Sequence, residues 1–260
     1  MIKVGISGAT GRMGVNLVRL VLADAELKLV CAIERAGHPA LGRDIGTEAG
    51  IGHVGVTLAA EPVAGMQVLI DFSAPDGTAG LVDFCAAHGI AMVIGTTGIE
   101  GLRQKLADAS RKIAILASPN LSVGVNLLFR IAAEIARNLG PDYDIEIVEA
   151  HHRFKKDAPS GTALKIAEEI AKATGRSLEK NAVYGRHGKP IERAPGEIGI
   201  HAVRCGDIVG EHTITYCTLG ERVELKHTAH SRETFARGAL RAAKFLHGRK
   251  PGLYTMADVP

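Results

Sequence analysis

Aromatic residues are scarce in this chain. It has no tryptophan, and aromatic residues make up only 4% of its 260 residues. Proteins that bind single-stranded nucleic acid stack the bases on aromatic side chains, so this scarcity argues against that class. The formal net charge is only +3, without a basic tail or stripe, which argues against a protein that follows a phosphate backbone. We therefore expect no nucleic-acid partner.

Closely spaced cysteines and long apolar runs are missing as well. The four cysteines, Cys31, Cys85, Cys205 and Cys217, are widely separated and form no CxxC pair, so neither a zinc ribbon nor a redox motif is indicated. The N-terminal residues lack the charged and apolar regions of a signal peptide, and no apolar run approaches the roughly 18 residues that span a bilayer. These absences predict a reduced, cytoplasmic protein with no membrane partner.

Glycine is abundant, with 31 residues, and the first half of the chain has a regular alternation of strand-like and helix-like segments. In the first half, apolar strand-like segments alternate with helix-like segments of about ten to fifteen residues, which predicts parallel βαβ units with both sheet faces covered. We expect strand-like segments at 2–7, 27–34, 54–58, 67–73, 90–96 and 113–117, and helices at 11–23, 75–88 and 100–111. The fold class is therefore α/β, a Rossmann-like doubly wound parallel sheet.

Near residue 121 the pattern changes. A long amphipathic helix is followed by strands that alternate polar and apolar residues. One face of their sheet is therefore expected to be exposed to solvent or covered by another subunit. We expect helices at 122–139, 160–173 and 232–247, strands at 144–149, 196–205, 208–217 and 222–228, and turns at 206–207 and 219–221. This half therefore predicts a second, smaller α+β domain with a mixed, mostly open sheet.

A glycine-rich turn joins the first strand to the first helix. Glycines in such a turn allow a tight bend and let a pyrophosphate approach the backbone, while the helix N-terminus offers N–H groups to the phosphates. Its pattern is GxxGxxG, because Thr10 replaces the second glycine of the usual GxGxxG, and Glu34 follows 20 residues after Gly14 at the end of the second strand. An acidic residue there binds the ribose 2′-OH of a dinucleotide. The predicted cofactor residues in this region are Gly8, Ala9, Thr10, Gly11, Arg12, Met13 and Glu34.

The preferred cofactor stays open. Glu34 favours NADH, whereas the guanidinium of the adjacent Arg35 can hold the 2′-phosphate of NADPH, and Arg12 is a second possible phosphate partner. Having both an acid and a base at this position predicts weak discrimination between the two cofactors. We therefore expect the protein to bind NADH or NADPH.

Further polar segments follow later strands of the predicted parallel sheet. Ligands of open parallel sheets bind at the carboxyl ends of the strands, so these segments are expected to line the same site. Residues 71–73 lie at the end of one strand, and the segments at the ends of the next two strands contain Gly95, Thr96, Thr97, Ser118, Pro119, Asn120 and Leu121.

The segment 149–163 concentrates titratable groups between a strand and a helix. His151 has an ordinary pKa near neutrality and is a candidate general acid, while Lys155 and Lys156 could each hold an anion or donate a proton. Adjacent histidines point in different directions, so His151 and His152 are poor ligands for one metal ion, and we expect no metal. The sequence PSGT at 159–162 is typical of a helix start with N–H groups suited to a carboxylate or a phosphate.

These motifs together resemble a known family. The stretch HHRFKKDAPSGTA at 151–163, with 8–14, 95–98 and NLSVGVN at 120–126, is similar to the 4-hydroxy-tetrahydrodipicolinate (dihydrodipicolinate) reductases of the diaminopimelate route to lysine. Glu34-Arg35 and GDIVGEH at 206–212 resemble the same family, and the likeness spans essentially the whole chain. Phe154 occupies a position that is polar in some relatives, which leaves the local packing of the loop open.

The resemblance implies roles for individual residues. His151 corresponds to the family's proposed catalytic acid and Lys155 to its proton donor, while His152, Gly161 and Thr162 would hold the carboxylates of a small dicarboxylate substrate. Residues 8–13 with Glu34 and Arg35 would bind the adenosine side of the cofactor, and 95–97 with 118–121 would line its nicotinamide end. Hydride would add to C4 of the dehydrated substrate, and the resulting enamine would be protonated from the His151/Lys155 loop.

The resemblance also implies a domain organisation. Residues 1–121 and 232–260 would form the dinucleotide-binding domain, and 122–231 would form the substrate-binding and oligomerisation domain. The two would close about hinges near 121 and 231, and four copies would assemble through the sheets of the second domain into a homotetramer.

Two other functions remain to be weighed. A semialdehyde dehydrogenase would need a nucleophilic cysteine after a strand near the cleft, whereas Cys85 lies within a predicted helix and the other cysteines lie on strands. A protein that only senses a dinucleotide would bind NADH without consuming it, and would not need the His-Lys loop.

Overall fold

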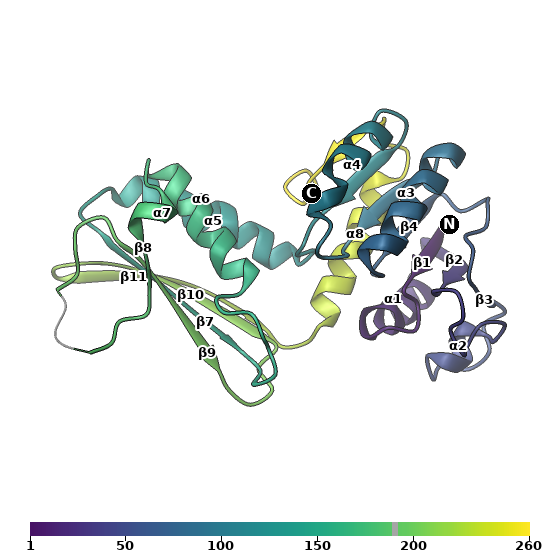
Figure 1. The fold of residues 1–260 in the computed structure, drawn as a ribbon, viewed down its shortest axis with the longest axis horizontal. Coiled ribbons are helices and arrows are strands. Elements are labelled where there is room, and N and C mark those ends of the chain that lie inside the picture. Colours follow the sequence, from purple (N-terminus) through teal and green to yellow (C-terminus); the bar gives the residue numbers. More distant parts are fainter. Residues whose placement is uncertain (189–191) are drawn as a thin grey trace. The chain divides into compact units, whose positions relative to one another are not determined.

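The computed structural model describes residues 1–188 and 192–260 (Figure 1). The chain divides into two compact units. The first comprises Met1–Val123 with Glu233–Pro260, and the second comprises Gly124–Arg232.

The first unit contains a parallel sheet of seven strands, in the order β12-β6-β5-β4-β1-β2-β3. The strand order reverses between β1 and β4, the point where ligands bind in a doubly wound sheet. The strands are β1 (Ile2–Ser7), β2 (Leu27–Ile33), β3 (Leu58–Ala59), β4 (Val68–Asp71), β5 (Ala91–Ile94), β6 (Ala114–Ala117) and β12 (Gly252–Tyr254).

Helices cover both faces of this sheet, as its near-continuous apolar strands require. The described helices are α1 (Arg12–Ala23), α2 (Ile45–Glu48), α3 (Pro75–His88), α4 (Arg103–Ala109), preceded by the short 3₁₀ helix η1 (Glu100–Leu102), and α8 (Glu233–Leu246). Alternate residues of β4 separate two clusters: Val68 and Ile70 pack with α1 and α8, whereas Leu69 packs with α3 and α4. The sheet is therefore the middle layer of three.

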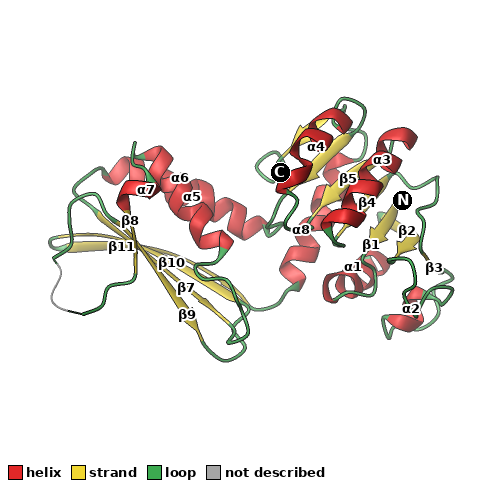
Figure 2. Ribbon diagram, viewed as in Figure 1, coloured by secondary structure: helices red, strands yellow, loops and turns green. Residues whose placement is uncertain are grey.

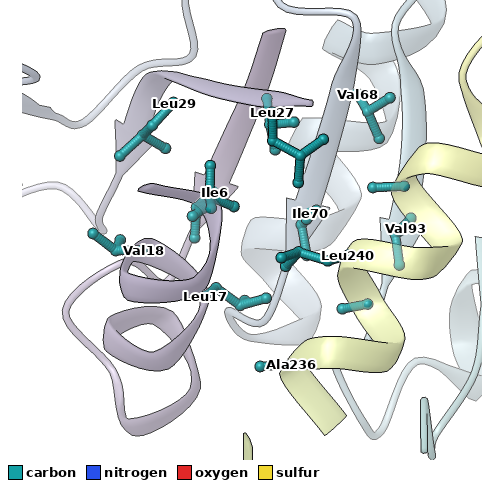
Figure 3. Close-up of a cluster of buried hydrophobic side chains, with 14 of the residues drawn as sticks. Ile6, Leu17, Val18, Leu27, Leu29, Val68, Ile70, Val93, Ala236 and Leu240 are labelled. Atoms are coloured by element: carbon teal, nitrogen blue, oxygen red, sulfur yellow. The ribbon is translucent and has the colours of Figure 1, made fainter. Parts of the chain in front are cut away.

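Helix α8 belongs to the first unit although its sequence follows the second. It lies against α1 and the central strands, and Figure 3 shows Leu240 of α8 and Leu17 of α1 beside Ile6 and Ile70 of the sheet. Burial of one such aliphatic side chain contributes about 1.5–3 kcal/mol to folding. The close approach of α8 depends on Gly238, because a Cβ there would overlap the carbonyl oxygen of Leu121.

The second unit contains a mixed five-stranded sheet, in the order β11-β10-β7-β9-β8. Strands β8 and β7 are parallel to β9, and β10 is antiparallel to β7 and β11. The strands are β7 (Asp144–His151), β8 (Ala182–Tyr184), β9 (Ile198–Arg204), β10 (Gly210–Thr218) and β11 (Glu221–Ala229), and the helices are α5 (Val123–Leu139), α6 (Gly161–Ala173) and α7 (Leu178–Asn181).

One face of this second sheet is covered and the other is open. Figure 2 shows α5 and α6 on one side of the strands. On β7, Ile145 and Ile147 are buried on the covered face, whereas the side chain of Val148 is 40% exposed. The alternating pattern of the sequence therefore corresponds to an amphipathic sheet.

The predicted fold class is confirmed, and most element bounds agree within two or three residues. The expected strand at 54–58 is wrong, because β3 occupies only Leu58–Ala59, and α2, α7, β8 and β12 were not foreseen. No helix in the described part of the chain is long and apolar enough to cross a membrane.

Two further differences affect the functional loop. The strand expected to end at Glu149 continues to His151, because β7 pairs with β9 as far as His151 and Arg204. The turn at Gly206-Asp207 does not join neighbouring strands, since β7 lies between β9 and β10. It instead carries the chain past the end of β7, where the Arg153 N–H donates to the carbonyl of Gly206 (3.1 Å).

Candidate active site

The glycine-rich turn lies at the carboxyl end of β1, where the sheet reverses its order. The N–H groups of Gly8 and Ala9 both donate to the carbonyl of Ile33 (3.0 and 3.2 Å), which ties the turn to the end of β2. Gly8 has a φ of +71°, and a Cβ there would overlap the carbonyl oxygen of Phe72 after β4. Helix α1 then begins after Gly11, which has no side chain to cap it, so the N-terminus is left open for an anion.

The carboxylate of Glu34 is held at the same edge. Its Oε1 accepts hydrogen bonds from the N–H (3.0 Å) and the hydroxyl (2.7 Å) of Thr10. Nε2 of His38 lies 3.4 Å from the same hydroxyl, and its Nδ1 accepts from the N–H of Ala40. Because Nδ1 accepts, Nε2 carries the proton in the neutral ring. His38 belongs to none of the motifs recognised in the sequence.

A buried carboxyl group links the next two strand ends. Asp71, the last residue of β4, is fully buried and accepts from the hydroxyls of Ser73 (2.6 Å), Thr78 (2.5 Å) and Thr96 (2.9 Å). The hydroxyl of Thr96 is thereby committed to Asp71, and Thr97 beside it is exposed. Asp71 therefore fixes the loops after β4 and β5.

The segment after β6 is held by local hydrogen bonds. The hydroxyl of Ser118 donates to the carbonyl of Asn120 (2.8 Å), and Oδ1 of Asn120 accepts from the N–H of Ser122 (3.0 Å). The side chain of Leu121 is only 2% exposed and packs in the core. The side chain of Leu121 is therefore not exposed to a ligand at this strand end.

In the second unit, His151 stands at the end of β7 above a buried carboxylate. Nδ1 of His151 lies 2.6 Å from Oε2 of Glu149, whose side chain is fully buried. Arg204 on β9 forms two hydrogen bonds with this carboxylate, each of 2.8 Å, and the N–H of Ser160 donates to its Oε1 (2.9 Å). Burial raises the pKa of Glu149, but these donors outweigh burial and hold the pKa below its usual value.

Lys155 lies in the loop that follows. Its Nζ contacts both carboxylate oxygens of Asp157 (2.8 and 2.9 Å), and its N–H donates to the carbonyl of His152. Burial lowers the pKa of His151, and the nearby positive charges of Lys155 and Arg204 lower it further against the opposing effect of Glu149. The positive charges of Lys155 and Arg204 therefore disfavour protonation of the His151 imidazole.

The start of α6 closes this side of the site. Ser160 is the N-cap, and its hydroxyl accepts from the N–H of Ala163 (3.1 Å) and lies 3.1 Å from Nε2 of His212. Gly161 and Thr162 form the first turn, which contains no acidic residue. Nδ1 of His152 is buried and has no hydrogen-bond partner among the residues described, so its hydrogen-bonding capacity is unused.

Each unit gathers its own set of predicted residues. In the first unit, residues 8–13, Glu34, Arg35 and the segments 95–97 and 118–121 lie at the carboxyl ends of four parallel strands, β1, β2, β5 and β6. In the second, the segment from His151 to Thr162 joins the end of β7 to the start of α6. Within residues 1–188 and 192–260, no three His, Cys, Asp or Glu side chains come together as a potential metal site.

Several residues of the site were missed or underrated. Arg204 and His212 lie far from the loop in sequence, and only the pairing of β7 with β9 and β10 brings them to it. Glu149 and Asp71 were noted only as parts of longer segments. The sequence held one signal for Glu149. It lies two residues before His151, so on a strand the two side chains share a face.

The comparisons with known proteins assign the family. The family models "Dihydrodipicolinate reductase, N-terminus" and "Dihydrodipicolinate reductase, C-terminus" match residues 2–121 and 124–259. The 4-hydroxy-tetrahydrodipicolinate reductase of Anaeromyxobacter dehalogenans strain 2CP-1 is 50% identical over 100% of this chain and 97% of its own length. That of Thiobacillus denitrificans is 50% identical over 99% and 98%.

Solved structures agree at the level of the fold. A dipicolinate-bound dihydrodipicolinate reductase from Paenisporosarcina sp. TG-14 has a TM-score of 0.77 at 24% identity, covering 99% of this chain and 98% of its own. A myo-inositol dehydrogenase from Corynebacterium glutamicum has a TM-score of 0.58 at 16% identity, over 99% and 92%. The full-length similarity to the curated relatives shows that this chain belongs to the 4-hydroxy-tetrahydrodipicolinate reductase family of oxidoreductases.

Proposed function

We propose that this protein reduces 4-hydroxy-tetrahydrodipicolinate, through its dehydrated form, to tetrahydrodipicolinate with NADH or NADPH, in the diaminopimelate route to lysine. The observation that carries the proposal is the cluster at the end of β7. An imidazole on a buried, clamped carboxylate stands near the ammonium of Lys155, at the start of a helix without acidic residues in its first turn. Such a cluster can bind a dianion and deliver a proton to it.

The residues of the first unit fit a dinucleotide. The uncapped N-terminus of α1 suits the pyrophosphate, and the carboxylate of Glu34 stands at the end of β2, where a ribose is recognised. Oε1 of Glu34 is bound by Thr10, whereas Oε2 is bound only by the N–H of Arg35 (3.2 Å) among the contacts described, leaving acceptor capacity for a ribose hydroxyl. The guanidinium of Arg35 is exposed beside it and suits a 2′-phosphate. The protein would therefore accept either cofactor.

The residues of the second unit suit a small dicarboxylate. The half-buried imidazole of His152 would hold one carboxylate, and the first turn of α6 at Gly161 and Thr162 offers the positive end of a helix to another. Lys155, held by Asp157, adds a positive charge. Two anionic groups would thus be neutralised by groups that the fold has already positioned.

The reduction needs one hydride and one proton. When bound, the reduced nicotinamide supplies the hydride, which adds to C4 of the unsaturated ring and leaves an enamine. C3 of the enamine then takes a proton from Lys155 or His151, which completes tetrahydrodipicolinate. The cationic groups and the helix end stabilise negative charge on the ring and its carboxylates during this step.

The assembly and location of the protein are part of the proposal. The open face of the second sheet exposes Val148 (40%) and Val203 (44%), apolar side chains that a second copy would cover, and we propose that four copies assemble through these sheets. The four cysteines are free thiols, which fits a reducing compartment such as the cytoplasm.

An activity assay tests the function. The purified protein, supplied with NADH or NADPH and the product of the preceding synthase, is expected to oxidise the cofactor with stoichiometric formation of tetrahydrodipicolinate, followed by absorbance and mass spectrometry. Cofactor binding without oxidation when substrate is added would instead identify a dinucleotide-sensing protein.

The environment of His151 predicts a pH dependence. Because burial and nearby positive charge lower its pKa below 6.5, the free protein loses this proton below that pH. If protonated His151 is required, kcat/KM falls as the pH rises, and the midpoint of this descending limb lies below about pH 6.5. The bound dianion favours the imidazolium, so the limb in kcat is expected at a higher pH.

The two profiles would be measured from about pH 5 to pH 9 in wild type and in His151→Asn. The limb in kcat/KM should vanish in the variant. If both proteins show the same limb, another group carries that proton.

A further inference from the structure

Glu149 is a buried carboxylate that pairs with His151 and accepts hydrogen bonds from Arg204 and Ser160. It is the sixth residue of β7 and His151 is the eighth, so both side chains leave the same face of the strand. The carboxylate is fully buried and receives Nδ1 of His151, two nitrogens of Arg204 and the N–H of Ser160, all at 2.6–2.9 Å. A buried carboxylate with this many donors is rigidly oriented.

Arg204 links the carboxylate to the loop. It lies opposite His151 in the parallel pairing of β7 with β9, which places its guanidinium over Glu149. Nη1 of Arg204 donates to Oε2 and Nη2 donates to Oε1, and Nη2 also donates to the carbonyl of Asp157 (2.6 Å). The guanidinium therefore holds both the carboxylate and the partner of Lys155.

This arrangement decides which nitrogen of His151 is free. An ionised carboxylate can only accept, so the Nδ1 of His151 carries the proton and Nε2 is the atom directed away from Glu149. Gly210 on β10 leaves room for that nitrogen, because a Cβ there would lie 3.1 Å from Nε2. His212, whose ring centroid is 5.3 Å from that of His151, has its pKa lowered to about 3 by burial and stays neutral.

We propose that Glu149 is a positioning residue, clamped by Arg204, that holds His151 in its Nδ1–H form and directs Nε2 toward the substrate. The effect on turnover rests on the proposed function, whereas the effect on the histidine does not. Comparable carboxylate–histidine pairs fix the tautomer and orientation of imidazoles in other catalytic and metal sites.

The test is the variant Glu149→Gln, studied by long-range ¹H–¹⁵N NMR of the full-length protein labelled with ¹⁵N-histidine. The backbone N–H of Ser160 can only donate, so the glutamine oxygen is expected to face Ser160 and the amide NH₂ to face His151. Nδ1 then has to accept, and the proton moves to Nε2. We expect a reversed tautomer for His151 and a kcat lowered about 10²-fold or more.

Glu146 provides a matched control. It lies on the same strand but faces the opposite side of the sheet, and it also pairs with a histidine, with Nε2 of His201 at 2.6 Å, and with Arg186. Glu146→Gln should leave the His151 signals as in wild type. The His151 signals are assigned from their loss in His151→Asn.

A second variant covers the case in which Glu149→Gln does not fold. Glu149→Asp keeps the charge but withdraws the carboxylate by one methylene, so it should give a mixed His151 tautomer and a kcat at least tenfold lower. Wild-type tautomer and kcat in whichever variant folds would overturn the proposal. If wild type itself proves inactive, the proposed reaction fails, while the tautomer measurement still decides whether Glu149 orients His151.

Discussion

Replacing Lys155 by alanine is expected to lower kcat by a factor of about 10²–10⁴, the range typical of losing a group that transfers a proton in the transition state. Lys155 is a partly buried ammonium, 20% exposed, with Nζ on both oxygens of Asp157. The residues predicted to bind the cofactor lie in the other unit, so the Kd of NADH should change little. Steady-state kinetics and titration of NADH fluorescence measure the two effects.

The neighbouring lysine is the control for this experiment. Lys156 is exposed and carries the same charge, so Lys156→Ala removes the same amount of positive charge from the loop. Its kcat should stay within about twofold of wild type, because exposed charges interact weakly across solvent. Equal losses in both variants would mean that the loop acts through its net charge, and a Lys155→Ala variant with wild-type kcat would exclude the proton-transfer role.

Replacing Asp71 by alanine is expected to lower the free energy of unfolding by about 3 kcal/mol. The substitution leaves the hydroxyls of Thr78 and Thr96, which are 0% and 5% exposed, without their acceptor, and each orphaned buried polar group costs about 1–3 kcal/mol. Because the chain has no tryptophan, urea unfolding would be followed by far-UV circular dichroism.

The same variant should also weaken cofactor binding. Asp71 positions the loops after β4 and β5 through Ser73 and Thr96, and the latter loop is among the predicted cofactor segments. Asp83→Ala is the control, since Asp83 on α3 is 69% exposed and pairs only at the surface with Lys105. That variant should change stability by no more than about 0.5 kcal/mol. If both variants unfold alike, the hydrogen-bond network around Asp71 contributes little.

Local patterns of the sequence were enough to predict most of the longer elements in both units. Strand β1 and helix α3 occupy the residues that apolar runs, Pro75 and Gly89 predict, and Ser160 caps α6 as PSGT indicates. These features depend on residues within a few positions of one another. The bounds of β7 could not be predicted in this way, because its last two residues are strand only through pairing with β9.

The GDIVGEH segment at 206–212 is a motif whose structural role could not be predicted from the sequence. Its resemblance to the family was visible in the sequence, but no role followed from it. In the structure Gly210 leaves space for Nε2 of His151, and His212 packs against the His151 ring beside Ser160. Both effects require β10 to lie next to β7, a pairing that connects residues about 60 positions apart.

The family and the fold class could be predicted from the sequence, as could the segments proposed to form the site, because glycine turns, helix caps and apolar periods are short-range signals. Which side chains meet within those segments could be seen only in the folded chain. The clamp of Arg204 on Glu149, the orientation of His151 and the anchoring of two strand ends by Asp71 all join residues whose neighbours are set by strand register and burial. The hydrogen-bond partner of a buried polar group depends on which residues the strand register places beside it. Local sequence patterns do not specify that register.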